Sequence, residues 1–229
     1  MRVKVGFTPR EEVAAPVGIV IDVLRATSTI CQALASGYER VVCFAEIDDA
    51  RALSGGDVVL AGERRNVRIE GFDFGNSPRE FIDSPERKTL ALTTTNGTRL
   101  LLAASARCDQ VLVASLLNLD AVADAVRNAE EVAVLCAGVE GAFAIDDAYV
   151  AGRIAAALGG EPDDAAIAAI KLAASFPSAQ EGIGGGTSAD NIRRAGLDED
   201  VAFCAQESVL DVVPRVVVRE SSSVVVAVG

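Results

Sequence analysis

Residues 90–106 read Leu-Ala-Leu-Thr-Thr-Thr-Asn-Gly-Thr-Arg-Leu-Leu-Leu-Ala-Ala-Ser-Ala. A short apolar strand is predicted to run into a cluster of hydroxyl and amide side chains, and an alanine-rich helix follows. The start of that helix offers unpaired backbone N–H groups, and the planar guanidinium of Arg99 can donate two hydrogen bonds to one oxyanion. The segment therefore predicts an anion-binding loop at a strand end. A plain helix cap and turn made by the same residues is the alternative.

Residues 17–31 repeat this design, reading Val-Gly-Ile-Val-Ile-Asp-Val-Leu-Arg-Ala-Thr-Ser-Thr-Ile-Cys. Asp22 falls at or just past the carboxyl end of the predicted strand, where open α/β sheets bind their ligands. Arg25, Thr27 and Ser28 repeat the arginine-plus-hydroxyl chemistry. We predict that the two segments converge on one crevice, with Asp22 for a metal beside donors for an anion. An ordinary helix cap at Asp22 is the alternative.

Strand-like and helical patterns alternate over the first two thirds of the chain. The strand-like runs are 2–7, 17–23, 40–44, 57–61, 89–93, 111–114 and 132–136, and the helical patterns between them are 26–36, 47–53, 97–106 and 119–127. This alternation predicts an α/β fold, a three-layer α/β/α arrangement with a parallel or mixed central sheet.

The last third of the chain changes in composition. Alanine-rich helices are predicted at 146–158 and 163–175, a glycine-rich loop at 180–188, and a further helix at 189–195; valine-rich strands are predicted at 201–205, 214–219 and 223–228. We expect one domain over residues 1–229. A subdomain boundary near residue 160, at Gly159-Gly160-Glu161-Pro162, is left open.

The chain has 229 residues, of which 50% are hydrophobic, so it can bury one large core or two small ones. No apolar run approaches the roughly 18 residues that a membrane-spanning helix needs. The apolar stretch 13–21 follows Arg2 and Lys4 as in a secretory signal, but Glu11 and Glu12 interrupt that pattern. We therefore expect a soluble, cytoplasmic protein with no membrane partner.

The chain contains no histidine, and its five cysteines are scattered without a Cys-x-x-Cys pair. The lack of histidine excludes Ser-His-Asp triads, histidine-nucleophile phosphatases and histidine-ligated metals. The cysteines lie mostly in apolar segments, which indicates buried, reduced thiols. A bound metal must therefore have oxygen ligands, and this favours Mg²⁺ over Zn²⁺.

Thirty-three acidic and 21 basic residues give a net charge of −12. Such a field makes nucleic acid a poor partner. It also repels an anionic substrate unless the binding site is locally positive. The acidic, lysine-poor and alanine-rich composition fits either a salt-rich cytoplasm or a GC-rich genome, and both interpretations stay open.

Two more loops carry polar residues. In residues 62–80, Ser77 is predicted to cap a helix whose first turn contains Pro78. Phe72 and Phe74 of this loop either pack down over a cleft or form a small hydrophobic staple.

In residues 135–147, Gly138 and Gly141 flank Glu140 after a third strand end, and the next helix opens with Asp146-Asp147. Acidic residues at a helix start also occur for dipole reasons alone. We assign one of these two aspartates to the cap and keep Asp146 as a candidate metal ligand.

Together these segments resemble those of the 2-phosphosulfolactate phosphatase family, a Mg²⁺-dependent group associated with coenzyme M biosynthesis. The matching segments follow the family order over nearly the whole chain: Ile21-Asp-Val-Leu-Arg-Ala-Thr-Ser-Thr-Ile30, Gly62-Glu-Arg64, Gly71-Phe-Asp-Phe-Gly-Asn-Ser-Pro78, Thr93-Thr-Thr-Asn-Gly-Thr-Arg99, Cys136-Ala-Gly-Val-Glu-Gly141, Asp200-Val201, Cys204-Ala205 and Val213-Pro214. Arg65-Asn66 is a departure, because the family pattern leads us to expect small residues there.

The resemblance implies a three-layer α/β/α fold and a Mg²⁺-dependent enzyme that hydrolyses the phosphate ester of 2-phospho-3-sulfolactate to 3-sulfolactate and phosphate. A phosphatase of another small phospho-acid is one alternative. A non-catalytic anion-binding module on the same fold is the other. A homodimer is left open.

On these segments we predict catalytic and metal-binding roles for a small set of residues. The catalytic residues are Asp22, Arg25, Glu63 and Arg99, and the Mg²⁺ ligands are Asp22, Glu63 and Asp146. Asp22 resembles the nucleophile of haloacid-dehalogenase phosphatases, but Leu24 stands where those enzymes have a second aspartate. We therefore take Asp22 as a metal ligand first and a nucleophile second. The predicted substrate contacts are Thr27, Ser28, Arg64, Asn76, Ser77, Thr94, Thr95, Asn96, Gly97, Thr98, Gly138, Glu140 and Gly141.

Overall fold

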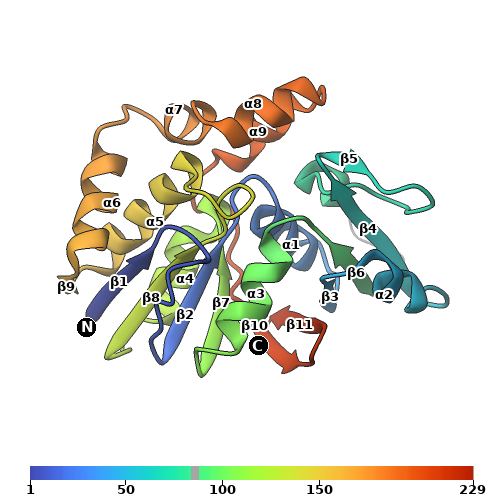
Figure 1. Cartoon of the computed structure of the whole chain (residues 1–229), viewed down its shortest axis with the longest axis horizontal. Coiled ribbons are helices and arrows are strands. Elements are labelled where there is room, and N and C mark those ends of the chain that lie inside the picture. Colours follow the sequence, from blue (N-terminus) through green and yellow to red (C-terminus); the bar gives the residue numbers. More distant parts are fainter. Residues whose placement is uncertain (84–87, 229) are drawn as a thin grey trace.

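The computed structural model describes residues 1–83 and 88–228, which form one large mixed sheet with helices on both faces (Figure 1). Its strands are β1 (Arg2–Gly6), β2 (Val17–Ile21), β3 (Arg40–Phe44), β4 (Val58–Arg64), β5 (Val67–Arg68), β6 (Thr89–Thr93), β7 (Gln110–Ala114), β8 (Glu131–Cys136), β9 (Glu161–Pro162), β10 (Pro214–Arg219) and β11 (Ser223–Val228). Its α-helices are α1 (Ala26–Ala35), α2 (Ile47–Ala52), α3 (Gly97–Ser105), α4 (Leu119–Ala125), α5 (Ile145–Leu158), α6 (Asp164–Ala174), α7 (Ala179–Gly184), α8 (Thr187–Arg194) and α9 (Asp198–Cys204). Short 3₁₀ turns occupy η1 (Pro78–Phe81) and η2 (Leu116–Asn118).

The sheet consists of two parallel blocks joined by an antiparallel ribbon. Its strand order is β5-β4-β6-β3-β11-β10-β7-β2-β8-β1-β9. Strands β4, β6 and β3 are parallel to one another, and so are β7, β2, β8, β1 and β9. The β10–β11 hairpin lies between the blocks and pairs antiparallel with β3 on one side and β7 on the other. The prediction of a parallel or mixed sheet is confirmed as a mixed one.

Side chains of the central strands enter two separate hydrophobic clusters, one on each face. In β2, Ile19 and Ile21 belong to the cluster that includes α4, α5 and α6, and Val20 belongs to the cluster that includes α1 and α3. This alternation follows from the two-residue period of a strand, and burial on both faces explains why β2 reads as a continuous apolar run. The three-layer α/β/α prediction is thereby confirmed.

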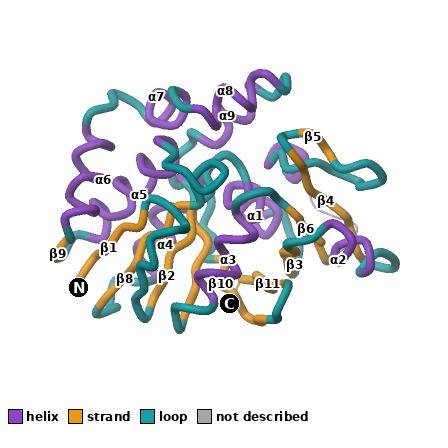
Figure 2. The backbone as a smooth tube through the Cα atoms, in the orientation of Figure 1, coloured by secondary structure: helices purple, strands orange, loops and turns teal. Residues whose placement is uncertain are grey.

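Helices α7, α8 and α9 form a further group beyond the sheet, across the carboxyl ends of β1, β2 and β8 (Figure 2). Here the sequence-based prediction is wrong in two places. The predicted strand at 201–205 lies in α9, whose first turn contains three acidic residues and whose Val201 and Cys204, three positions apart, are buried on one side. The predicted glycine-rich loop at 180–188 is largely the helices α7 and α8.

Residues on both sides of position 160 share one core. The short strand β9 pairs with β1, and Ala166 and Ala169 of α6 belong to the same buried cluster as Ile154 of α5. Within the described residues, no helix has the length and apolar character needed to cross a bilayer.

Candidate active site

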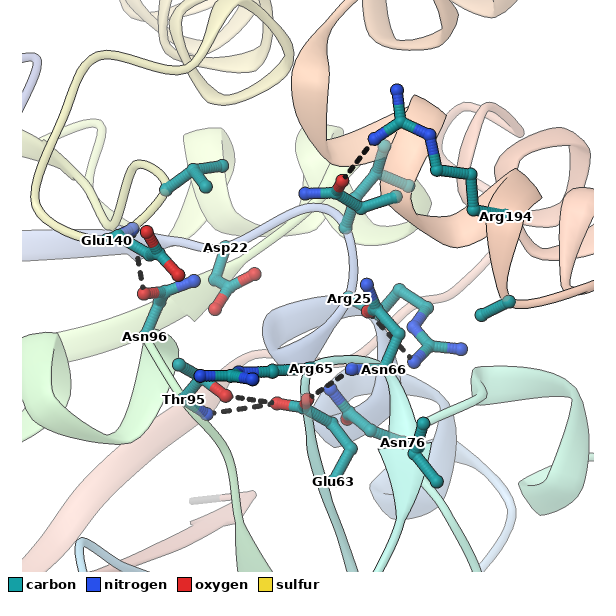
Figure 3. A pocket seen from close by; sticks show the side chains of 15 residues that line it. Asp22, Arg25, Glu63, Arg65, Asn66, Asn76, Thr95, Asn96, Glu140 and Arg194 are labelled. Atoms are coloured by element: carbon teal, nitrogen blue, oxygen red, sulfur yellow. Dashed lines mark hydrogen bonds between the residues drawn. The ribbon is translucent and has the colours of Figure 1, made fainter.

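The carboxyl ends of strands from both parallel blocks surround one pocket of about 440 Å³ (Figure 3). It is lined by residues that follow β2 (Asp22, Leu24, Arg25), residues at the end of β4 and in the turn to β5 (Glu63, Arg65, Asn66, Val67), Asn76, residues that follow β6 (Thr95, Asn96) and β8 (Val139, Glu140), and residues at the end of α8 (Asn191, Arg194, Ala195). The two segments expected to converge, 17–31 and 90–106, therefore meet here. This position outside strand ends is where open α/β sheets bind ligands.

Asp22 lies at the centre of this pocket with most of its side chain buried. Burial first, and then the negative charges of Asp146 and Glu63, raise the pKa of Asp22 to about 7. The N–H of Ala26 donates to Asp22 Oδ1 at 3.4 Å, so the carboxylate also faces the start of α1 as a cap would. The N-cap residue of α1 is Arg25, so Asp22 is not the ordinary cap of the alternative; it accepts from the helix start from a position three residues before the N-cap.

Gly97 allows α3 to begin directly against Asp22. A Cβ atom at this position would lie 2.7 Å from Asp22 Oδ2 and 2.6 Å from the Cβ of Ala26. Only a residue without a side chain fits such an approach. The glycine of the Asn-Gly pair is therefore needed for the close packing of α3 against Asp22.

Glu63 is buried and fixed by three protein donors. Its Oε2 accepts from the N–H of Asn66 at 2.8 Å, and its Oε1 accepts from the N–H and the hydroxyl of Thr95, both at 3.0 Å. These bonds join the ends of β4 and β6 on the pocket wall. They orient the carboxylate and use both acceptor positions of Oε1, whereas Oε2 accepts one bond and keeps a second acceptor position available.

The two aspartates at the start of α5 have different surroundings. Asp147 accepts from the N–H of Val23 and the N–H of Gly138, both at 2.9 Å, so it ties together the segments after β2 and β8. Asp146 accepts from the hydroxyl of Ser188 at 3.0 Å, and burial raises its pKa to about 6. Asp147 is therefore held by backbone donors, and the charges of both aspartates interact with that of Asp22. Asp146, predicted as a metal ligand, is buried outside the pocket lining.

Several of the predicted substrate contacts lie behind the pocket and hold its loops in place. The Thr27 hydroxyl accepts from the N–H of Asp22 at 3.1 Å, and the Ser28 hydroxyl donates to the carbonyl of Val23 at 2.8 Å. The hydroxyls of Thr94 and Thr98 lie 3.2 Å apart. The predicted contacts that do line the pocket are Asn76, Thr95, Asn96 and Glu140; those outside its lining are Thr27, Ser28, Arg64, Ser77, Thr94, Gly97, Thr98, Gly138 and Gly141.

The arginines of the predicted site divide in the same way. Arg64 donates to the carbonyls of Glu63 and Ala45 and to the hydroxyl of Thr93, so it braces neighbouring strand ends. Arg99 is exposed on α3 and is not part of the pocket lining. Arg25, in contrast, is buried and lines the pocket.

Two arginines of the pocket were not predicted. Arg65 lines it from the turn between β4 and β5, where its φ of 54° lies in the left-handed region that few residues other than glycine adopt. Its departure from the family pattern was a signal that could have identified it. Arg194 reaches the pocket from the end of α8, and its guanidinium donates to the side chain of Asn191 at 3.1 Å. No local pattern distinguishes Arg194 from a solvated helix residue.

Among residues 1–83 and 88–228, no cluster of three or more histidine, cysteine, aspartate or glutamate side chains is arranged to hold a metal by itself. The five cysteines are free and buried, as predicted, and burial raises the pKa of the Cys31, Cys43 and Cys204 thiols to about 12. Protonated, buried thiols are poor nucleophiles.

A profile of the family described as 2-phosphosulpholactate phosphatase matches residues 5–219. The chain belongs to this family. Its relatives include proteins named probable 2-phosphosulfolactate phosphatase from three other organisms. The Thermus thermophilus protein is 39% identical over 222 residues, covering 93% of this chain and 94% of the relative. The Thermotoga maritima protein is 35% identical over 218 residues, covering 94% and 95%, and the Symbiobacterium thermophilum protein is 36% identical over 222 residues, covering 92% and 95%.

Membership of the family confirms the sequence-based resemblance over almost the whole chain. It also confirms the predicted enzyme class, that of the phosphoric monoester hydrolases. The pocket described above contains residues from five of the segments on which that resemblance rests.

Proposed function

We propose that the chain is a Mg²⁺-dependent phosphatase that hydrolyses the phosphate ester of 2-phospho-3-sulfolactate to 3-sulfolactate and phosphate. One observation carries the chemical side of this proposal: a buried carboxylate, Asp22, faces a pocket that is also lined by Arg25, Arg65 and Arg194. Family membership supports the choice of substrate. The same proposal assigns the reaction to the cytoplasm and to the formation of coenzyme M.

The oxygen donors of the pocket fit Mg²⁺. Mg²⁺ is usually bound by one or two carboxylates, and water and phosphate oxygens complete its octahedron, so a cluster of three protein ligands is not required. Asp22 is buried beside the acidic side chains of Asp146 and Glu63, whose charges disfavour its ionised form. A divalent cation would reverse that repulsion, and we assign Asp22 as the principal ligand and Glu63 as a second ligand, with Asp146 as a third candidate behind the pocket wall. When bound, Mg²⁺ polarises the phosphoryl group and neutralises charge that develops on it.

The arginines supply the positive charge that an acidic protein needs to bind an anion. The substrate carries a phosphate, a carboxylate and a sulfonate. A guanidinium binds each of these groups through two parallel N–H donors. Three arginines line the pocket: Arg25 just before α1, Arg65 in the turn after β4 and Arg194 at the end of α8. Despite a net charge of −12, the site is locally suited to a multiply charged anion.

Asp22 acts in this proposal as a ligand and not as a nucleophile. Its Oδ1 accepts from Ala26, Gly97 approaches its Oδ2, and Leu24 replaces the second aspartate of the haloacid-dehalogenase pattern. Charge neutralisation and positioning supply most of the catalysis that a protein can give to phosphoryl transfer. Phosphate release with a water nucleophile follows from this assignment.

The experiment is phosphate release by the purified protein from a panel of small phosphate esters: 2-phospho-3-sulfolactate, 2-phospholactate, 3-phosphoglycerate and a neutral phosphate ester. Each is measured with Mg²⁺ and again with EDTA. We expect the highest kcat/KM for 2-phospho-3-sulfolactate and no turnover with EDTA. A higher kcat/KM for another phospho-acid would show that 2-phospho-3-sulfolactate is not the preferred substrate. Phosphate binding without any hydrolysis would show that the chain is an anion-binding module.

A further inference from the structure

Arg25 is held in the pocket wall by a side chain from the far end of the chain. Its Nη1 donates to Asp200 Oδ2 at 2.6 Å, and its Nη2 lies 3.4 Å from Asn66 Oδ1. The side chains of Arg25 and Asp200 are 1% and 0% exposed, so water contributes almost nothing to this pair. The remaining nitrogen, Nε, is buried and has no hydrogen-bond partner among the described residues.

Asp200 uses both of its oxygens to organise this corner of the site. While Oδ2 accepts from Arg25, Oδ1 accepts from the Ser77 hydroxyl at 2.6 Å. Asp200 lies in the first turn of α9, and Ser77 precedes the 3₁₀ turn η1. One carboxylate therefore joins α9 to the segment before η1 and to the start of α1.

Stability alone gives a weak reason for such a pair. Removing two charges from water costs about as much as their attraction returns, and apolar side chains of similar volume often serve as well. Arg25 also stands on the wall between the main pocket and a neighbouring one of about 530 Å³. The guanidinium thus has Nη1 fixed by Asp200 and Nη2 by Asn66, and each of these two nitrogens keeps a second N–H group, while the unpaired Nε is buried.

We propose that Asp200 is a positioning residue, which fixes the guanidinium of Arg25 so that the second N–H groups of its two Nη nitrogens bind the phosphoryl oxygens of the substrate. This inference rests on the proposed function, which gives Arg25 that anion to bind. Asp200 itself does not line the main pocket, so its effect on the substrate passes through Arg25.

The test replaces Asp200→Asn, which keeps the shape and removes the charge that holds Arg25. We expect kcat and kcat/KM to fall together by about 10- to 100-fold, the usual loss when the partner of a ligand-binding side chain is removed. The matched control is Glu207→Gln. Glu207 follows α9 and forms a two-bond ion pair with Arg153, at 2.7 Å for each bond, away from the pocket. Its loss should leave kcat within about two-fold of wild type, because nothing in the site changes.

A double-mutant cycle separates positioning from a purely structural role. In an Arg25→Ala background, Asp200→Asn should cost less than about two-fold in kcat, because the residue through which it acts is gone. A merely structural Asp200 would lower the thermal midpoint when it is replaced in the wild-type background and leave the kcat of the folded protein unchanged. Equal losses from Asp200→Asn in the two backgrounds would likewise overturn the proposal.

A second measurement keeps this inference separate from the proposed function. Binding of inorganic phosphate in the presence of Mg²⁺, measured by calorimetry, needs no knowledge of the natural substrate. We expect Asp200→Asn to weaken phosphate binding about 10-fold or more, and Glu207→Gln to leave it unchanged. If wild type fails to hydrolyse 2-phospho-3-sulfolactate but this difference holds, the substrate is wrong and the positioning role stands. If Asp200→Asn binds phosphate as wild type does, the positioning role is wrong whatever the substrate.

Discussion

At the scale of single residues, Asp22 accepts a hydrogen bond from the start of α1 and also lines the pocket. A cap and a metal ligand need different things from the side chain. A cap needs only an acceptor oxygen, and asparagine supplies one nearly as well as aspartate. A ligand for a divalent cation needs the charge.

Asp22→Asn separates these roles. We expect kcat to fall at least about 100-fold, because several kcal/mol of charge stabilisation around the phosphoryl group are lost while the fold survives. Steady-state phosphate release and far-UV circular dichroism measure the two effects. Turnover within a few-fold of wild type would reduce Asp22 to an acceptor for the start of α1.

The raised pKa of Asp22, about 7 because of burial and the neighbouring Asp146 and Glu63, also predicts how stability depends on pH. Since the folded protein holds this proton more tightly than the unfolded chain, the metal-free protein should lose stability as the pH rises from about 4 to 7. Asp22→Asn has no such proton. We therefore expect its free energy of unfolding, relative to wild type in EDTA, to increase by a few kcal/mol between about pH 5 and pH 8.

Denaturant unfolding at the two pH values tests this linkage. Titrating groups that do not interact with Asp22 affect wild type and variant equally, so the difference between the two proteins reports Asp22 together with Asp147, whose pKa is raised in part by the charge of Asp22. A difference that stays constant with pH would show that Asp22 ionises normally.

Arg65 and Arg99 are the two candidates for the arginine that binds an anionic group of the substrate through two hydrogen bonds. The segment 90–106 predicts Arg99, whereas the pocket contains Arg65. We expect Arg65→Lys to lower kcat/KM by about 10- to 150-fold, because a single ammonium cannot reproduce a two-bond clamp whose charge-assisted bonds contribute about 1.5–3 kcal/mol. Arg99→Lys is the matched control and should change kcat/KM by less than about two-fold. The reverse ranking would restore the sequence-based assignment.

At the scale of elements, the two strand-to-helix crossings are predictable because their chemistry is local. Each combines an apolar run with a polar cluster at its end, and this pattern is enough to bring Asp22 and Thr95 to one crevice. The C-terminal elements are harder to predict. Val201 and Cys204 are three positions apart and face one core, which is a helical spacing, but the short, uninterrupted apolar run Val-Ala-Phe-Cys-Ala makes 201–205 read as a strand. Arg194 reaches the pocket because of the way α8 packs, and no local sequence pattern predicts that packing.

The start of α3 is the element whose placement matters most for Asp22. Gly97→Ala would put a methyl group 2.7 Å from Asp22 Oδ2, so α3 or the carboxylate must move. We expect a loss of about 1–3 kcal/mol in stability, as for other overpacked sites, and a clear fall in kcat. Thermal melting and phosphate release measure both.

Gly185→Ala is the control for that prediction. A Cβ at Gly185 would meet its nearest neighbour, the carbonyl oxygen of Glu181, at an ordinary 3.6 Å. This variant should retain both stability and activity. If Gly97→Ala behaves in the same way, the close approach of α3 to Asp22 is not required.

At the scale of the whole molecule, the site joins the two parallel blocks of the sheet. Asp22 follows β2 in one block, and Glu63 ends β4 in the other, with the β10–β11 ribbon between them in the strand order. The pocket therefore depends on how the blocks are placed, and a ligand held from both sides should stabilise that placement. The acidic net charge of −12 works in the opposite direction, because it adds repulsion to a compact chain.

Mg²⁺ should consequently stabilise the entire fold. A cation at about 100 times its Kd adds roughly 2.7 kcal/mol to the free energy of unfolding, which for a chain of this size raises Tm by about 5–10 °C. We expect this shift in wild type with MgCl₂ against KCl at equal ionic strength, and its loss in both Asp22→Asn and Glu63→Gln, which remove one ligand from each block. Glu207→Gln removes an acidic charge away from the pocket and should keep the full shift. A shift that survives in Asp22→Asn and Glu63→Gln would mean that Mg²⁺ only screens the surface charge, because screening does not depend on which carboxylate is removed.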